Sequence, residues 1–141
     1  METKELLEAI QHINRKFSDA KWVKGQNGNV LSYTALKLAA MKAYLVDEKE
    51  DAHKKMLEAE IEMDREKAVA YKKAMAESNA TAAKDSKYAD ETFIEARKNY
   101  AAAKVYYEKL KSVVADSHDM IESIRSRIID LQGARKDEGI R

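Results

Sequence analysis

The sequence has no cysteine and no proline among its 141 residues. Without cysteine there is no disulfide framework, no thiolate ligand for a metal and no thiol nucleophile. Without proline, and with only four glycines, the chain has few residues that interrupt a helix. Alternating runs of β-branched and aromatic residues bounded by turns, which would predict strands, are also missing. We therefore expect an all-α fold.

Neither sign of charge dominates, because 26 Lys and Arg stand against 25 Asp and Glu. This balance excludes a uniformly basic coat for DNA, but it leaves room for a local basic strip. The longest apolar runs are too short to span a bilayer, and the N-terminal stretch METKELLEAI is too charged for a signal peptide. We therefore expect no membrane partner and a cytoplasmic location.

What is present is helical periodicity. Four apolar residues on one stripe predict a short first helix over about residues 3–19: Leu6, Ile10, Ile13 and Phe17. The stretch AKWVKGQNGN then supplies the turn-forming residues Gly25, Asn27, Gly28 and Asn29. The first helix is therefore expected to end before this turn.

A second helix is expected over about residues 30–76, with a thin apolar seam that the charged stretch DEKEDAHKK dilutes. No Gly or Pro in that stretch forces a break. The seam consists of Leu38, Met41, Leu45, Ala52, Met56, Ala59, Met63 and Ala70. It predicts one face that packs on another helix.

A third helix is expected over about residues 90–132, and its seam is the most regular in the chain. The seam residues are alternately three and four apart: Phe93, Ala96, Tyr100, Ala103, Tyr107, Leu110, Val114, Ser117, Ile121, Ile124, Ile128 and Leu131. Four more apolar residues lie off this seam and form a second flank: Tyr106, Val113, Met120 and Ile129. Gly133 stands where a C-cap would end the helix.

The length of the third helix bears on assembly. Its seam covers about 39 residues, or about 58 Å, whereas a compact globule of this chain length is roughly 37 Å across. We therefore expect residues 1–141 to form a single helical domain, in which the two long helices make an antiparallel hairpin or coiled coil that assembles into an oligomer. The expected oligomer interface comprises Tyr107, Leu110, Val114, Ile121, Ile124, Arg125, Arg127, Ile128 and Leu131.

Little in the sequence points to catalysis. The three histidines, His12, His53 and His118, lie on different segments, and the usual phosphate-loop, dinucleotide, zinc-protease and nucleophile-elbow motifs are missing. His118 and Glu122 share a helix face, which suits either a metal hydrolase or, as we favour, a solvated face. We expect no catalytic residue, no metal and no cofactor.

Basic residues stand beside aromatic ones in three places, a combination that suits single-stranded nucleic acid because cations contact phosphates while rings stack on bases. The candidate binding residues are Lys21, Trp22, Lys24, Tyr71, Lys72, Lys73, Lys84 and Lys87. Trp22 is also typical of a packed anchor that closes a helical corner. Lys72 and Lys73 equally suit a solvated helix face.

Three stretches together resemble a known family. LSYTALKLAAMKAYL (31–45) is similar to an early helix, EIEMDREKAVAYKKAM (60–75) to a segment with an apolar-Lys-x-Arg motif, and SIRSR (123–127) to a short Ile-Lys-Ser-Arg stretch. The family is that of the phage recombination mediator proteins of the UvsY type, and the likeness covers most of the chain. Lys72 matches the motif lysine. The motif arginine falls on Ala74, a departure that Lys73 offsets with a neighbouring charge.

The resemblance implies a role in DNA recombination and repair. Such proteins bind single-stranded DNA, form ring-like homo-oligomers, and help to load a RecA-type recombinase onto strands coated by single-strand binding protein. They are not enzymes, and a phage-encoded member would act in the host cell cytoplasm. The alternative from the residues alone is a coiled-coil structural or assembly protein with no nucleic-acid role.

The two arginines of SIRSR fit oligomer contacts better than a phosphate clamp. Arg125 and Arg127 are two residues apart, so they point roughly 200° from each other around the helix. One helix cannot direct both at the same phosphate. We therefore expect them to flank the seam and form ion pairs between helices.

Overall fold

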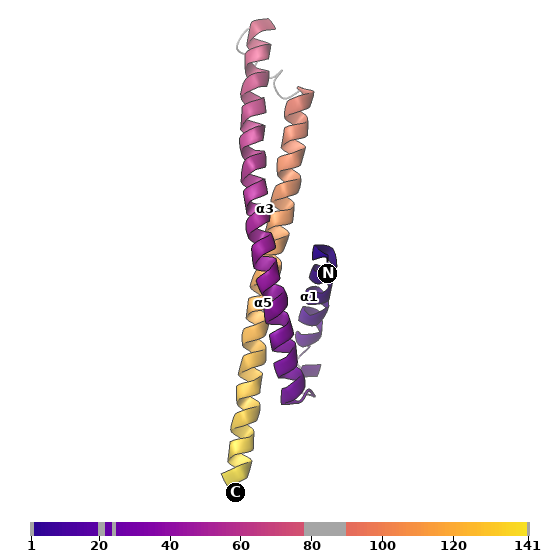
Figure 1. The fold of residues 1–141 in the computed structure, drawn as a ribbon, viewed down its shortest axis with the longest axis vertical. Helices are drawn as coiled ribbons and strands as arrows, with labels where there is room; N and C mark the ends of the chain where they lie inside the picture. The colour runs from indigo at the N-terminus through magenta and orange to yellow at the C-terminus, as the bar shows by residue number, and fades with distance from the viewer. Residues whose placement is uncertain (1, 20–21, 24, 78–89, 141) are drawn as a thin grey trace. The chain divides into compact units, whose positions relative to one another are not determined.

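The computed structural model describes residues 2–19, 22–23, 25–77 and 90–140, with side chains described up to Gly133. Figure 1 shows three helices, α1 (Thr3–Phe17), α3 (Gly28–Glu77) and α5 (Glu91–Ile140). No strand occurs in these ranges. The all-α prediction is confirmed, and so is the packing of the two long helices against each other.

Short polar side chains mark where both long helices begin. The Asn27 Oδ1 accepts a hydrogen bond from the Val30 backbone N–H at 2.9 Å. The Asp90 Oδ1 accepts one from the Phe93 N–H at 3.1 Å. Each bond satisfies a backbone donor that has no partner within the first turn of a helix. Once started, α3 continues through the charged stretch at residues 47–55 without interruption.

The prediction that Gly133 ends the last helix is wrong. Helix α5 continues to Ile140, and no described glycine has a positive φ, which a glycine C-cap requires. A single glycine inside a helix costs about 1 kcal/mol relative to alanine. Residues 134–138, with the sequence ARKDE, are mostly good helix formers, so their propensity outweighs that cost.

The chain divides into two compact units. Unit 1 comprises Met1–Glu48 and Leu110–Arg141, and unit 2 comprises Lys49–Lys109. Unit 1 therefore contains α1, the first part of α3 and the second part of α5. Unit 2 contains the remaining part of each long helix.

Unit 1 holds the large core side chains. Its central cluster joins the three helices through Phe17, Leu31 and Ile124. The side chains that pack around this cluster are Ile13, Trp22, Val23, Ala35, Met120, Ile128 and Leu131. Met120 belongs to the second apolar flank of α5, and it packs against this central cluster.

The long helices are antiparallel in both units. In unit 1, Lys42 of α3 contacts His118 of α5, whereas Ser32, earlier in α3, lies beside Ile128, later in α5. In unit 2, the rings of His53 and Tyr107 stack with centroids 4.7 Å apart. Further along α3, Met63 lies beside an earlier part of α5. As the residue number increases along α3, the number of the neighbouring residue on α5 decreases, as it must for antiparallel helices.

Unit 2 has a thinner interior than unit 1. Its buried residues are Ala52, Ala70, Ala74, Phe93 and Ala96. Alanine side chains let two helices approach closely, but they bury little apolar surface. Unit 2 is therefore held by a narrow seam, and much of its apolar surface stays exposed.

Candidate nucleic-acid interface

A groove of about 520 Å³ lies in unit 2. We call it the Arg97 groove, and it is lined by Met63, Ile94, Arg97, Lys98, Tyr100 and Ala101. Five of these residues come from α5 and only Met63 comes from α3. The groove thus combines apolar surface with two cationic side chains and one aromatic ring.

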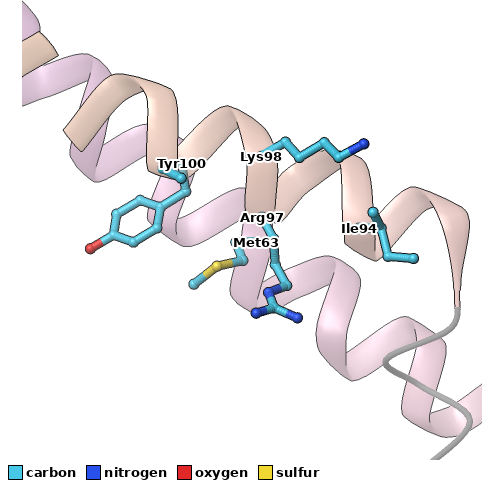
Figure 2. A pocket seen from close by; sticks show the side chains of 6 residues that line it. Met63, Ile94, Arg97, Lys98 and Tyr100 are labelled. Carbon is cyan, nitrogen blue, oxygen red and sulfur yellow. The ribbon is translucent and has the colours of Figure 1, made fainter. Parts of the chain in front are cut away.

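Figure 2 shows how the polar ends are arranged around this groove. The Arg97 guanidinium and the Tyr100 ring extend to the same side of α5 and lie on either side of Met63, whereas the Lys98 Nζ points away. Lys98 therefore lines the groove with its aliphatic stem. A flat apolar group bound over Met63 in this groove would have the Tyr100 ring on one side and the Arg97 guanidinium on the other.

The first turns of α5 hold Arg97 in place. Its guanidinium lies over the Phe93 ring, 5.7 Å from the centroid. Phe93 is buried, and its backbone N–H is capped by Asp90. A buried ring on a capped turn is a stable platform for a cation one helical turn further on. Residues three and four apart share a helix face, which brings Arg97 and Tyr100 together.

The predicted pair Lys72 and Lys73 lies on the last turns of α3, also in unit 2. Both side chains are exposed, while Tyr71 is half-buried. Along α3 they lie about 15 Å beyond Met63, with Lys72 about 180° and Lys73 about 80° around the helix from it. Unit 2 thus contains both the predicted lysines and the Arg97 groove.

Position 74 explains one departure from the family motif. Ala74 is only 8% exposed, so a side chain at this position of α3 is buried. An arginine there would have to bury its charge, which is costly without a partner. Lys73 lies next to it in the sequence and is exposed, so the available cation in this chain is at 73.

Trp22 has the packing role that its place at a helical corner also suggested. Its ring meets Phe17 edge-on, with centroids 4.7 Å apart and planes at 77°. The Lys16 Nζ lies 5.2 Å from the Trp22 ring centroid. Nucleotide stacking on this half-buried ring stays a prediction. The other predicted cations, Lys21, Lys24, Lys84 and Lys87, lie outside the described residues.

The residues predicted to join copies are mostly enclosed within the chain. Four are buried in unit 1: Leu110, Val114, Ile121 and Ile124. Three are half-buried, of which Tyr107 stacks on His53, while Ile128 and Leu131 pack on the central cluster. Tyr107, Ile128 and Leu131 thus have packing partners within the chain. A contact between copies at these residues stays a prediction.

The arginines of SIRSR differ in their surroundings. Arg125 forms an ion pair with Glu122 of its own helix, with Nη1 3.0 Å from Oε1. It therefore does not need a second helix for its charge. Arg127 is half-buried, and its Nε is enclosed with no hydrogen-bond partner among the described residues. The predicted pairing of Arg127 with another copy stays a prediction.

His118 contacts a cation rather than a second metal ligand. The Lys42 Nζ lies 3.0 Å from the His118 Nδ1, in a unit 1 groove of about 270 Å³ that Glu122 and Arg125 also line. The Lys42 ammonium is thus the contact of one of the two His118 ring nitrogens. Over the described ranges, no group of three or more His, Asp and Glu is placed to hold a metal ion.

Sequence reasoning missed the Arg97 groove. The spacing of Tyr100 assigns it to the seam, and neither Arg97 nor Lys98 belongs to a stretch that the sequence singles out. A signal was present: two adjacent cations stand between the seam residues Ala96 and Tyr100, just after the buried Phe93. What the sequence lacked was the pairing of α3 with α5 that places Met63 here.

Comparisons give no relative from which a function would follow: no family model, no curated protein and no solved structure matches the chain. Within the part of the chain that the structure describes, no helix has the length and apolar character needed to cross a membrane. Any functional assignment therefore depends on the residues themselves.

Proposed function

We propose that this chain binds single-stranded DNA through unit 2, using the Arg97 groove together with Lys72 and Lys73. The observation that carries the proposal is that the Tyr100 ring and the Arg97 guanidinium line one open groove on the same side of α5 (Figure 2). A ring stacks on any base, and a cation contacts any phosphate. This pair therefore suits a strand that is held without sequence readout.

The lack of ion pairs at three lysines of unit 2 supports the same proposal. Considering the described residues alone, no carboxylate lies within ion-pair distance of Lys72, Lys73 or Lys98. By contrast, Lys55 is paired with Asp51 at 3.0 Å further back on α3. An unpaired cation keeps its full attraction for phosphate, because no neighbouring charge has to be displaced first.

The resemblance to phage recombination mediators extends the proposal to a role. On this view the protein is not an enzyme, acts in DNA recombination and repair, and helps to load a RecA-type recombinase onto single strands coated by single-strand binding protein. Carried over in the same way are a ring-like homo-oligomer and action in the host cytoplasm. Lys72 is the one residue that belongs both to the family motif and to the binding site proposed here.

Charge reversal tests the binding site directly. The variant K72E/K73E removes two phosphate contacts and adds two repulsive charges. The control K37E/K111E makes the same change in net charge on two exposed lysines of unit 1. Fluorescence anisotropy with a labelled oligothymidylate at low salt measures both. We expect the first variant to bind at least tenfold more weakly and the control to stay within about threefold of the unchanged protein.

Equal loss of affinity in the two double variants would contradict the assignment of the site to unit 2. Such a result would mean that only the net charge matters. Circular dichroism on both variants checks that helix content is unchanged. A surface lysine contributes little to stability, so both are expected to fold.

A second candidate function is a coiled-coil assembly protein with no nucleic-acid role. Exposed apolar residues on α3 favour it, since Leu57 and Ile61 are 43% and 69% exposed. Gel shift at low salt separates the two candidates. A stable oligomer by light scattering, together with no retarded strand at any protein concentration, would select the assembly protein.

A further inference from the structure

One exposed stripe of α3 in unit 2 has the pattern of an interface. Leu57 and Ile61 are four residues apart, so they lie on one face of the helix. They are 43% and 69% exposed, although both side chains are large and apolar. The seam towards α5 runs through other residues, among them Ala52 and Ala70, which are buried. Leu57 and Ile61 therefore have no cover within the described chain.

Two opposite charges flank this apolar pair. Lys54 precedes Leu57 by three residues, and Asp64 follows Ile61 by three, so all four share the same face. We call these four residues the Leu57 stripe. Both charged side chains are exposed.

The charges of the stripe are available, whereas their neighbours are already paired. Asp51 and Lys55 form an ion pair at 3.0 Å, and Glu62 pairs with Arg65 at 2.6 Å. For Lys54 and Asp64 no ion pair exists with any residue that the structure describes. The local network satisfies the charges on either side and leaves these two free for a partner.

The order of the four residues makes the stripe complementary to itself. When two copies of α3 lie antiparallel with Leu57 of one opposite Ile61 of the other, Lys54 of each copy lies opposite Asp64 of the other. The contact then has an apolar centre and an opposite-charge pair at each end. A parallel arrangement would place Lys54 against Lys54 and Asp64 against Asp64.

We propose that the Leu57 stripe is the contact between two copies of this chain, antiparallel along α3 and related by a twofold axis. A contact of this kind is isologous, so each copy contributes the same residues. The partner is a second copy, because Lys54 at one end of the stripe is complementary in charge to Asp64 at the other end when two copies lie antiparallel. The contact would also bury Leu57 and Ile61, and so add buried apolar surface to unit 2, whose interior is mostly alanine. The inference stands independently of nucleic-acid binding.

Charge exchange at the two ends provides the test. K54D gives a stripe with two carboxylates, and D64K gives one with two ammonium groups. In a homodimer of either variant both end contacts become repulsive, so we expect the dissociation constant to rise roughly tenfold or more. K109D, at an exposed lysine on α5 in unit 2, is the control and is expected to behave as the unchanged protein.

Mixing makes the test specific to the register. In a mixture of K54D with D64K, each end of the mixed pair again joins a carboxylate to an ammonium group. Sedimentation equilibrium should therefore show that the mixture associates more tightly than either variant alone. The double variant K54D/D64K should associate like the unchanged protein, which also shows that the single variants failed through charge and not through misfolding.

Three results would overturn the proposal. One is an unchanged protein that sediments as a single chain, or as a particle with an odd number of copies. Another is a pair of single variants that associate as well as the unchanged protein. The third is a mixture that associates no better than its components.

Discussion

At the scale of the residue, the same chemistry has different consequences in the two units. Trp22 and Tyr100 are both aromatic side chains with a cation nearby: Lys16 lies 5.2 Å from the Trp22 ring centroid, and Arg97 lines the same groove as Tyr100. Trp22 packs edge-on against Phe17 within the core of unit 1. Tyr100 instead lines an open groove, with Arg97 on the same side of α5. The open groove beside the Tyr100 ring leaves space for a base.

The substitution Tyr100→Leu tests stacking apart from charge. It keeps an apolar side chain in the half-buried position and removes the aromatic face. Stacking of a base on a ring contributes about 1–3 kcal/mol, so we expect affinity for a labelled oligonucleotide to fall about 5-fold to 150-fold. The dependence of affinity on salt should stay unchanged, since no phosphate contact is lost. Anisotropy at several salt concentrations measures both quantities.

Tyr33→Leu is the matched control, because Tyr33 is 68% exposed and lies in unit 1. It should leave affinity unchanged. A loss of affinity in the Tyr33 variant equal to that in the Tyr100 variant would contradict the placement of the site. So would a Tyr100 variant that binds as tightly as the unchanged protein.

At the scale of the element, α5 contains an unfavourable residue in its interior. A Cβ added at Gly133 meets no atom within 4 Å, and its φ is not positive. Gly133→Ala should therefore raise the free energy of unfolding by about 0.5–1 kcal/mol, because alanine loses less backbone entropy in a helix. Urea denaturation followed by circular dichroism measures the change.

Gly28→Ala provides the comparison. A Cβ added at Gly28 also meets no atom within 4 Å, but Gly28 is the first residue of α3, where helix propensity counts for less. We expect a smaller gain there than at Gly133. A loss of stability on Gly133→Ala would show that α5 does not continue as a helix through this residue.

The elements themselves were largely predictable from the sequence. The three-four repeat of α5 from Phe93 to Leu131 follows from local spacing, and none of its members is exposed in the structure. The C-terminal end of α5 was not predictable from one residue, because the glycine signal was outweighed by its neighbours. The role of α1 was not predictable either, since the cluster of Phe17, Leu31 and Ile124 joins residues far apart in the chain.

The candidate site was predictable only in part. Lys72 and Lys73 follow each other in sequence, so a search for basic and aromatic stretches finds them. The Arg97 groove needs Met63 from α3 beside Arg97 from α5, and that pairing depends on the register between two helices. The register between the two helices is set by packing between residues far apart in the chain, and the spacing of residues within one helix does not reveal it. The Leu57 stripe could have been found as a second repeat, but its exposure became clear only from the structure.

At the scale of the whole molecule, the net charge of +1 gives no general attraction for nucleic acid. Binding therefore depends on the local cations of unit 2, which are Lys72, Lys73 and Arg97, and on the number of copies that one DNA strand contacts. Two copies joined through the Leu57 stripe would present two such sets of cations. The second set then binds at a high effective concentration, which raises affinity without any new contact.

The salt dependence of single-strand binding by the unchanged protein tests the central claim most directly. Each phosphate contact on a single strand contributes about −0.7 to the slope of log affinity against log salt, so Lys72, Lys73 and Arg97 together predict a slope of about −2 per copy. Titration of a labelled oligothymidylate at increasing salt measures this slope. A linear decrease of that size or steeper is the predicted result. A flat line, or no binding at low salt, would contradict the account.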